Sequence, residues 1–264
     1  MPTDLMDRTP KESFMKNLKF LFTTLGIFAT SAMLQSCDNN DTVFPDNYPT
    51  ALVTVCPDDD ESFVMNLDEN TVLNPVNIAK SPFGKKEVRA MVSFYFTNDG
   101  NQSVESDKNE IDVRNVHVCW IDSIRTKLPV PTVTDNNKTY GNDPFDIVKD
   151  WVTIGEDGYL TLCIRTKWGN PDKKHIINLV TGVNPDDPLE MEIHQDADGD
   201  VDGMLHDGLI AFNLNHIQDL SGDVKLKLKW NSYSGEKTAV INVKMRNQAT
   251  PEAFDRTLLI NKLD

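Results

Sequence analysis

Val224-Lys225-Leu226-Lys227-Leu228-Lys229-Trp230 is the stretch of sequence that decides the fold. Apolar and basic residues alternate along it, so four apolar side chains fall on one face and three lysines on the other. This alternation is typical of a half-buried β-strand with a solvated outer face. After the turn sequence Tyr233-Ser234-Gly235, the residues Ala239, Ile241, Val243 and Met245 alternate in the same way. The two runs together predict a β-hairpin with one face in a hydrophobic core.

Similar short runs precede this hairpin. They contain Leu160, Leu162 and Ile164; Leu189, Met191 and Ile193; and Ile210, Phe212 and Leu214. No helical period of useful length interrupts them. Six or seven short strands at this spacing are typical of an antiparallel β-sandwich, which we expect over residues 143–264.

A second group of strand patterns lies nearer the N-terminus. The clearest run, Arg89 to Thr97, places Ala90, Val92, Phe94 and Phe96 on one face and Arg89, Ser93 and Tyr95 on the other. Shorter runs at Ala51–Cys56, Phe63–Leu67 and Val116–Trp120 bring the count to four or five strands, which suits a small barrel over residues 48–126. Residues 127–142 contain two prolines and Asp135-Asn136-Asn137 with little apolar content, so we expect a linker there.

The first 36 residues have the composition of an export signal peptide. Lys16 and Lys19 precede an uncharged run from Phe20 to Met33, whose 14 residues are too few for a stable membrane span. Acidic residues before Met15 do not suit the start of such a signal, so we expect translation to begin at Met15.

Leu34-Gln35-Ser36-Cys37 resembles the bacterial lipobox, in which a cut before the cysteine is coupled to lipid attachment on its sulfur. Cys37 is therefore the expected lipidation site, and acyl chains such as palmitate would anchor the protein stably. An ordinary cleaved signal is the alternative. Residues 37–47 are expected to form a flexible tether. Asp38-Asn39-Asn40-Asp41 resembles acidic surface-export signals but lacks their denser acidic run. We therefore expect a lipid anchor in the cell envelope, at the outer membrane, and the sequence leaves open whether the protein is exposed at the surface or faces the periplasm.

Residues 37–264 are strongly acidic, with 22 basic and 38 acidic residues and a net charge of −16. This charge argues against unspecific nucleic-acid binding, which depends on basic side chains. It also disfavours a surface that lies on anionic lipid. The expected partners are the membrane, through lipid on Cys37, and an unidentified protein or glycan.

An acidic cluster is the strongest candidate for a metal site. Asp196, Asp198, Asp200, Asp202 and Asp207 occupy positions one, three, five, seven and twelve of an EF-hand-like count, where carboxylates could surround Ca²⁺. Val201 replaces the glycine of such a loop, and Asp207 replaces its final glutamate. The simpler interpretation is an acidic turn. Likewise, His194 and His206 are read as polar loop residues in preference to a transition-metal pair.

Weaker patterns mark two further kinds of site. Thr42 and Ser123 lie in short sequences that resemble O-glycosylation acceptors. Besides Cys37 there are three cysteines, so at most one disulfide forms, and a bridge between Cys56 and Cys119 would join residues of one domain. The interpretation we favour is that all three thiols are small buried hydrophobes.

The order of these features resembles the NigD-like lipoproteins of Gram-negative anaerobes. The resemblance is carried by Trp151-Val152, Gly158-Tyr159-Leu160, His175-Ile176-Ile177-Asn178-Leu179-Val180, His194-Gln195-Asp196-Ala197-Asp198-Gly199-Asp200 and Ala211-Phe212-Asn213-Leu214. It implies an N-terminal OB domain, a C-terminal β-sandwich and no established enzymatic activity. The predicted fold class is thus all-β, with a small OB-like barrel followed by an antiparallel β-sandwich.

No catalytic motif stands out in the sequence. It lacks His-Glu-x-x-His, Gly-x-Ser-x-Gly, a phosphate-binding glycine loop and a paired cysteine motif. The leading hypothesis is a non-catalytic binding or structural role in the cell envelope. A surface glycan-processing hydrolase is an alternative, because the carboxylates are too numerous for their spacing to identify a catalytic pair. An immunity-type or structural envelope protein is the other alternative.

Overall fold

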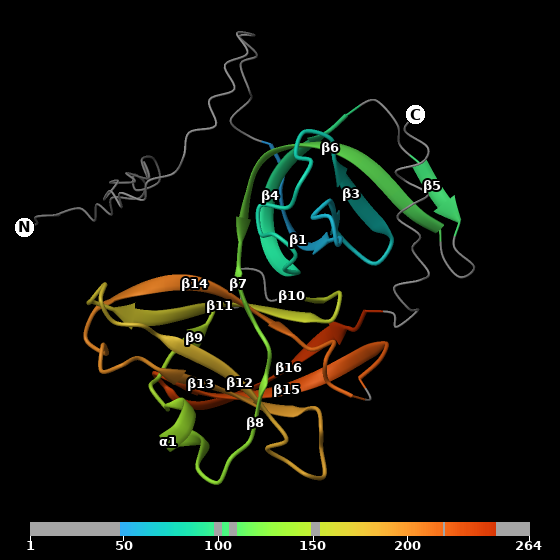
Figure 1. Ribbon diagram of the computed structural model, residues 1–264. Coiled ribbons are helices and arrows are strands. Elements are labelled where there is room, and N and C mark those ends of the chain that lie inside the picture. The colour runs from blue at the N-terminus through green and yellow to red at the C-terminus, as the bar shows by residue number, and fades with distance from the viewer. Residues whose placement is uncertain (1–47, 98–101, 106–109, 149–153, 219, 247–264) are drawn as a thin grey trace, which may run out of the picture. The chain divides into compact units, whose positions relative to one another are not determined.

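The computed structural model describes residues 48–97, 102–105, 110–148, 154–218 and 220–246. The elements are β-strands apart from one five-residue helix, and they form a barrel followed by a sandwich (Figure 1). The all-β fold class expected from the sequence is confirmed. In the part of the chain that the structure describes, no helix has the length and apolar character needed to cross a bilayer. The expected signal peptide, Cys37 and Thr42 lie outside the described residues.

The described part of the barrel domain contains six strands, five of which close the barrel. The six are β1 (Thr50–Pro57), β2 (Phe63–Asn66), β3 (Thr71–Pro75), β4 (Val88–Phe96), β5 (Gln102–Glu105) and β6 (Glu110–Ser123). Strand β1 pairs with β2 and β4, β2 pairs with β3, and β6 pairs with both β4 and β3. Five strands therefore close on themselves through the parallel pair β3–β6, which is the OB arrangement. Strand β5 forms a hairpin with the start of β6.

Alternation places one side of each barrel strand in a common core. Val53, Ala90, Val92 and Val116 are fully buried there. The register of β4 and β6 shifts between Ser93 and Phe94, so Cys119 has no register partner and lies in a bulge. Arg89 departs from the sequence-based expectation of a polar outer face, since its side chain is completely buried.

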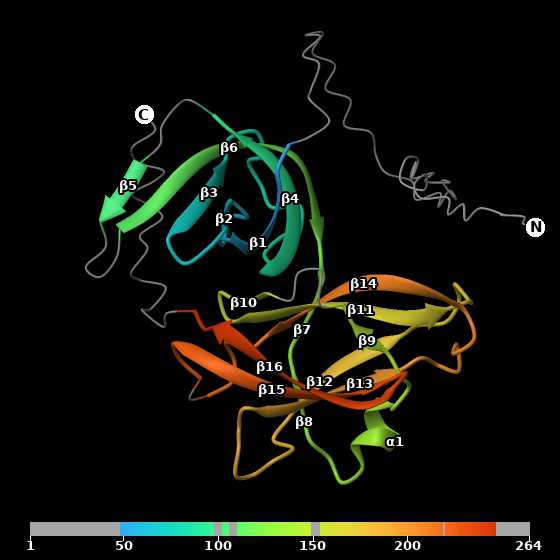
Figure 2. The ribbon, with the colours of Figure 1, turned by 180° about the vertical axis from the view of Figure 1, so that it is seen from behind.

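The sandwich has two sheets, visible from both sides in Figures 1 and 2. The first contains β10 (Ile154–Glu156), β11 (Tyr159–Trp168), β14 (Met204–Asn213) and β7 (Arg125–Lys127), with β9 (Asp146–Ile147) paired to β11. The second contains β16 (Gly235–Lys244), β15 (Asp223–Ser232), β13 (Glu190–Asp196), β12 (Ile176–Thr181) and β8 (Val130–Pro131).

The hairpin predicted from the alternation that begins at Val224 is confirmed. Strands β15 and β16 pair from Asp223 opposite Lys244 to Ser232 opposite Gly235. Leu226, Leu228 and Trp230 face the core, which they share with apolar residues of the other sheet. The intervening lysines lie on the outer face, so alternation alone predicted correctly which side of this strand is buried.

Residues 127–142, expected to be a linker, carry structure that belongs to the sandwich. Strand β8 pairs with β12, and helix α1 (Asn136–Tyr140) packs on β13. Just before this stretch, β7 pairs with β14. These elements are very short, and the helix has no buried residue, so they leave no apolar period in the sequence.

Barrel and sandwich strands both belong to one compact unit, residues 45–264. The buried guanidinium of Arg89 on β4 donates from Nη1 to Thr54 Oγ1 and from Nη2 to Glu156 Oε1 on β10, each at 2.8 Å. Its charge is thereby paired, as a buried cation requires.

Candidate functional site

The five aspartates considered as calcium ligands do not converge on one point. Asp207 accepts two hydrogen bonds from Arg165, at 2.7 and 2.8 Å, and Asp198 pairs with Lys173 at 3.1 Å. Among the residues that the structure describes, no group of three or more His, Cys, Asp or Glu side chains could hold a metal ion. The calcium hypothesis therefore gains no geometric support.

Asp200 instead links its own turn by hydrogen bonds to the loop that follows β11. Its carboxylate accepts hydrogen bonds from the backbone amides of Gly169 and Asn170 at 3.1 Å and lies 3.3 Å from His175 Nε2. These hydrogen bonds stabilise the charged form and lower the pKa of Asp200. Asp196 accepts from the amide of Asp198 within the same turn. The acidic segment thus corresponds to the simpler interpretation of a turn whose carboxylates cap backbone amides.

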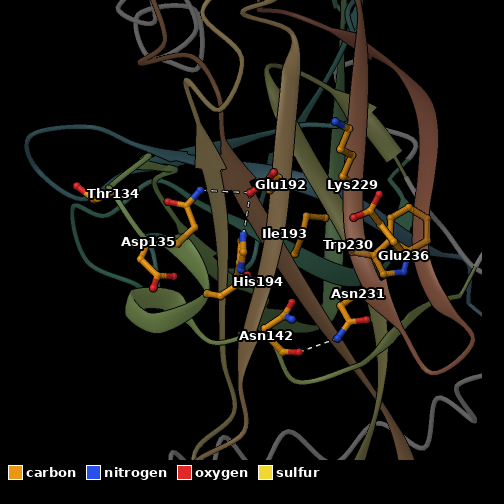
Figure 3. A pocket seen from close by; sticks show the side chains of 12 residues that line it. Thr134, Asp135, Asn142, Glu192, Ile193, His194, Lys229, Trp230, Asn231 and Glu236 are labelled. Atoms are coloured by element: carbon orange, nitrogen blue, oxygen red, sulfur yellow. Dashed lines mark hydrogen bonds and ion pairs between the residues drawn. The ribbon is translucent and has the colours of Figure 1, made fainter.

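A polar groove lies on the outer face of the second sandwich sheet, where α1 and the segment after it cross β13 and β15 (Figure 3). We call it the amide groove, and its volume is about 360 Å³. Its lining consists of Thr134, Asp135, Asn136, Asn137, Asn142, Glu192, Ile193, His194, Lys229, Trp230, Asn231 and Glu236. The volume falls within the range of small-ligand sites, but the lining is far more polar than is usual for a drug-like ligand.

Residues 134–142 cover one side of the amide groove, and we call them the covering segment. Local hydrogen bonds fix the conformation of this segment. Asp135 caps α1 by accepting from the amide of Lys138 at 3.0 Å. Asn136 accepts from the amide of Val133 and donates from Nδ2 to Glu192 Oε2 at 3.2 Å. Asn231 Nδ2 donates to the carbonyl of Asn142 at 2.7 Å. The groove therefore has a preformed wall that needs little ordering when a ligand binds.

His194 forms the base of the groove. Its side chain is 7% exposed, and its ring lies between the Gly141 carbonyl and the Glu192 carboxylate, as the dashed lines in Figure 3 show in part. The prediction that His194 is a polar loop residue is wrong, because His194 is a buried residue of strand β13.

The charged groups beside the groove are largely paired with one another. Glu190, which is buried, accepts hydrogen bonds from Lys227 at 2.6 Å and from Lys229. These bonds lower the pKa of Glu190 to about 2, and the bond with Glu190 raises the pKa of Lys229. By contrast, Asn137, Asn142 and Glu236 have no side-chain hydrogen bond or ion pair within the described part of the chain. Two amides and one carboxylate are thus available to a ligand.

The amide groove was not predicted from the sequence. Asp135-Asn136-Asn137 indicated only a domain boundary, because amide and carboxylate residues in a short stretch usually mark a turn. The only sequence signal available was the concentration of asparagines at 136, 137 and 142. Their approach to β13 and β15 depends on long-range packing.

The remaining predicted sites are dispersed. Cys56 and Cys163 are buried and Cys119 is exposed, and none of them is bonded to another, so the Cys56–Cys119 bridge is not made. The prediction that all three are buried thus holds for Cys56 and Cys163 but not for Cys119, which the bulge of β6 turns outward. Ser123 is the exposed last residue of β6, and its modification stays a prediction.

Three solved structures share this architecture. A protein named as toxin related from Parabacteroides distasonis is 24% identical, with 83% of this chain and 100% of that chain covered and a TM-score of 0.59. A protein of unknown function from Bacteroides vulgatus is 19% identical, with 81% and 99% covered and a TM-score of 0.56. A protein named as a lipoprotein from Bacteroides fragilis is 11% identical, with 76% and 100% covered and a TM-score of 0.50. At these identities the likeness concerns the fold.

Among curated protein sequences, none matches this chain. Two family models do match it. The NigD-like N-terminal OB domain matches residues 52–124, and the NigD-like C-terminal beta sandwich domain matches residues 128–243. Together they account for most of the chain and coincide with the barrel and the sandwich described above. The chain therefore belongs to the NigD-like family, with an OB domain followed by a β-sandwich domain.

Proposed function

We propose that this protein is a lipid-anchored, non-catalytic envelope protein that binds a neutral glycan in the amide groove. The observation that carries the proposal is the pair of unpartnered amides, Asn137 and Asn142, in a groove with a preformed wall. A side-chain amide both donates and accepts, and so does a sugar hydroxyl, so the two kinds of group match each other. Glu236 adds an acceptor at the rim.

The charge of the molecule supports a neutral ligand. The net charge of −16 over residues 37–264 repels phosphorylated or carboxylated ligands at long range. Lys229 is the cation in the groove lining, and it is already bound to Glu190. A ligand rich in hydroxyl groups therefore fits this groove better than an anionic one.

A binding screen of residues 38–264 against envelope and host glycans tests the proposal. We expect saturable binding without turnover, and Asn137→Ala with Asn142→Ala should weaken it at least tenfold. Asn170→Ala, in the loop between β11 and β12, is the matched control and should leave the affinity unchanged. Turnover of a glycan would instead favour a glycan-processing hydrolase.

The lipid anchor has its own test. Cys37 follows a sequence like a lipobox, and one lipidated cysteine with several acyl chains would hold the protein at the membrane stably. Radiolabelled palmitate should be incorporated by the wild type and lost in Cys37→Ala. A wild type that takes up no label would contradict the anchor but would leave the groove proposal intact.

Binding of a partner protein, as in an immunity-type role, is the second candidate. It is favoured by exposed apolar side chains where β11 ends and β14 begins: Trp168 is 41% exposed, and its register partner Met204 is 75% exposed. Exposed tryptophan and methionine are enriched in protein interfaces. Crosslinking in the native envelope would distinguish the candidates, because a partner protein should crosslink near Trp168 and lose that crosslink in Trp168→Ala.

A further inference from the structure

One outer face of the barrel carries four aromatic side chains, three of which stack on one another. Tyr95 on β4 and His117 on β6 are register partners whose rings stack with centroids 4.9 Å apart. Tyr48, just before β1, stacks on Tyr95 at 5.0 Å. Trp120 is the register partner of Ser93 on the same pair of strands and is 47% exposed. We call Tyr48, Tyr95, His117 and Trp120 the aromatic face.

These residues do not belong to the barrel core. The core is filled from the opposite side of the same strands by residues such as Phe94 and Val118, which are each 3% exposed. The bulge at Cys119 turns Trp120 outward. An outward strand position is ordinarily polar when it faces only water, so the aromatic face indicates contact with a further, partly apolar surface.

The side chains of the aromatic face indicate what kind of surface it contacts. Tyrosine, tryptophan and histidine combine an apolar ring with a polar tip, and the first two concentrate where hydrocarbon meets water at a membrane. The ring stack covers the faces of Tyr95, so a flat ligand could not stack on it, whereas its edge and the Trp120 ring are accessible.

The short chain between Cys37 and Tyr48 limits how far the aromatic face can lie from the membrane. This limit rests on the lipid anchor on Cys37 proposed above. Eleven residues can span at most about 38 Å in any conformation. A barrel of this size has a diameter on the order of 30 Å. A lipid on Cys37 therefore keeps Tyr48, and the aromatic face that begins there, within about one barrel diameter of the bilayer.

We propose that the aromatic face docks on the headgroup layer of a zwitterionic lipid bilayer, with Trp120 at the boundary of the hydrocarbon. The net charge of −16 over residues 37–264 selects lipids without net charge, since anionic headgroups repel the protein. Docking holds the barrel on the membrane and limits how the sandwich that follows can be presented.

The lipidated protein, residues 37–264, in phosphatidylcholine vesicles tests this proposal. Bromine placed on the acyl chains quenches tryptophan fluorescence on contact, and the chain has four tryptophans. We expect brominated vesicles to quench the wild type, and Trp120→Phe to remove at least half of that quenching. Trp168→Phe is the matched control, because Trp168 has a similar exposure of 41% but lies in the sandwich, and it should leave the quenching unchanged.

Flotation of the same vesicles shows whether the protein is bound to them at all, and so distinguishes failure of the docking from failure of the lipid anchor. Flotation without Trp120-dependent quenching overturns the docking and leaves the anchor standing. Absence of flotation overturns both, since the docking depends on the tether. Replacing a fifth of the phosphatidylcholine with the anionic lipid phosphatidylglycerol should reduce the quenching at low salt. An increase in quenching would overturn the choice of a zwitterionic surface. Circular dichroism of each variant confirms that the barrel is folded.

Discussion

The Nδ1 atom of His194 lies 2.8 Å from the carbonyl oxygen of Gly141, and this contact holds the covering segment of the amide groove on β13. A carbonyl only accepts hydrogen bonds, so Nδ1 is the donor. Gly141 has φ of +84°, and a Cβ atom there would lie 2.3 Å from the carbonyl oxygen of Gln195. Only glycine allows the segment to approach the strand this closely.

Gly141→Ala should therefore destabilise the sandwich by about 2 kcal/mol or more, through both backbone strain and collision with β13. Gly199→Ala is the matched control, since Gly199 has φ of +78° but no neighbour within 4 Å. We expect about 1 kcal/mol for the control. Urea denaturation of both variants measures the difference, and equal losses would show that close packing at Gly141 is unimportant.

Glu156→Ala should cost roughly 3 kcal/mol, because it leaves the fully buried Arg89 guanidinium without its carboxylate. Glu69→Gln, which breaks an exposed pair with Lys244, should change the free energy of unfolding by less than about 1 kcal/mol. Chemical denaturation gives both values. Similar effects for the two variants would mean that burial of Arg89 contributes little.

Glu190 should make stability depend on pH in the acid range. Its pKa is lowered to about 2 by hydrogen bonds from Lys227 and Lys229, whereas its ordinary value is 4.5. A lowered folded-state pKa gives stability that is fully present above pH 4.5 and is lost as the pH falls toward 2. The difference in urea midpoint between wild type and Glu190→Gln should therefore be largest near neutral pH and shrink between pH 4.5 and 2. A difference that is independent of pH would contradict this role.

Asp200→Asn should lower the thermal midpoint, because the carboxylate that accepts from Gly169 and Asn170 is replaced by a weaker acceptor. Asp202→Asn should not, since Asp202 has no such bond within the described residues. Millimolar calcium should shift neither midpoint. Differential scanning fluorimetry with and without calcium makes both comparisons, and a calcium-dependent rise abolished by Asp202→Asn would revive the metal hypothesis.

Cys119 should be the thiol that reacts in folded residues 38–264, because Cys56 and Cys163 are buried. Its reaction with a maleimide should be slow at neutral pH, since desolvation raises the pKa of the Cys119 thiol and so reduces the thiolate fraction. Mass spectrometry should find one adduct in the wild type and none in Cys119→Ser. Labelling of the wild type that appears only after reduction would indicate a disulfide.

The parts of the fold that were predictable are those in which side chains alternate over many residues. The hairpin β15–β16 has this property, because β15 buries one face and exposes much of the other. Strand β11 was predicted from the alternation of Leu160, Leu162 and Ile164, but all of residues 159–164 are buried, so it lies in the interior on both faces there. Strands β7 and β8 and helix α1 show no such alternation, since they have two to five residues and are fixed by pairing with distant strands. Arg89 also escaped prediction, because its burial depends on Glu156, which lies in another strand.

The candidate site was less predictable than the fold. Asn137 lies in α1 and Asn142 just after it, and nothing in their local sequence indicates that β13 and β15 pass beneath them. The acidic segment from Asp196 to Asp207 was a candidate calcium site because its spacing resembles that of an EF-hand loop. Its carboxylates serve turns and ion pairs with partners such as Arg165 and Gly169, which sequence spacing cannot reveal.

Closure of the barrel through the parallel pair β3–β6 sets an order of events during folding. Residues 71–75 remain without one of their neighbours until residues 112–116 have been synthesised. Contacts of such long sequence separation form slowly, and an open strand edge invites pairing with other chains. The edge of β3 is therefore exposed to wrong partners until β6 arrives, and this interval is the time when the barrel is most prone to aggregate.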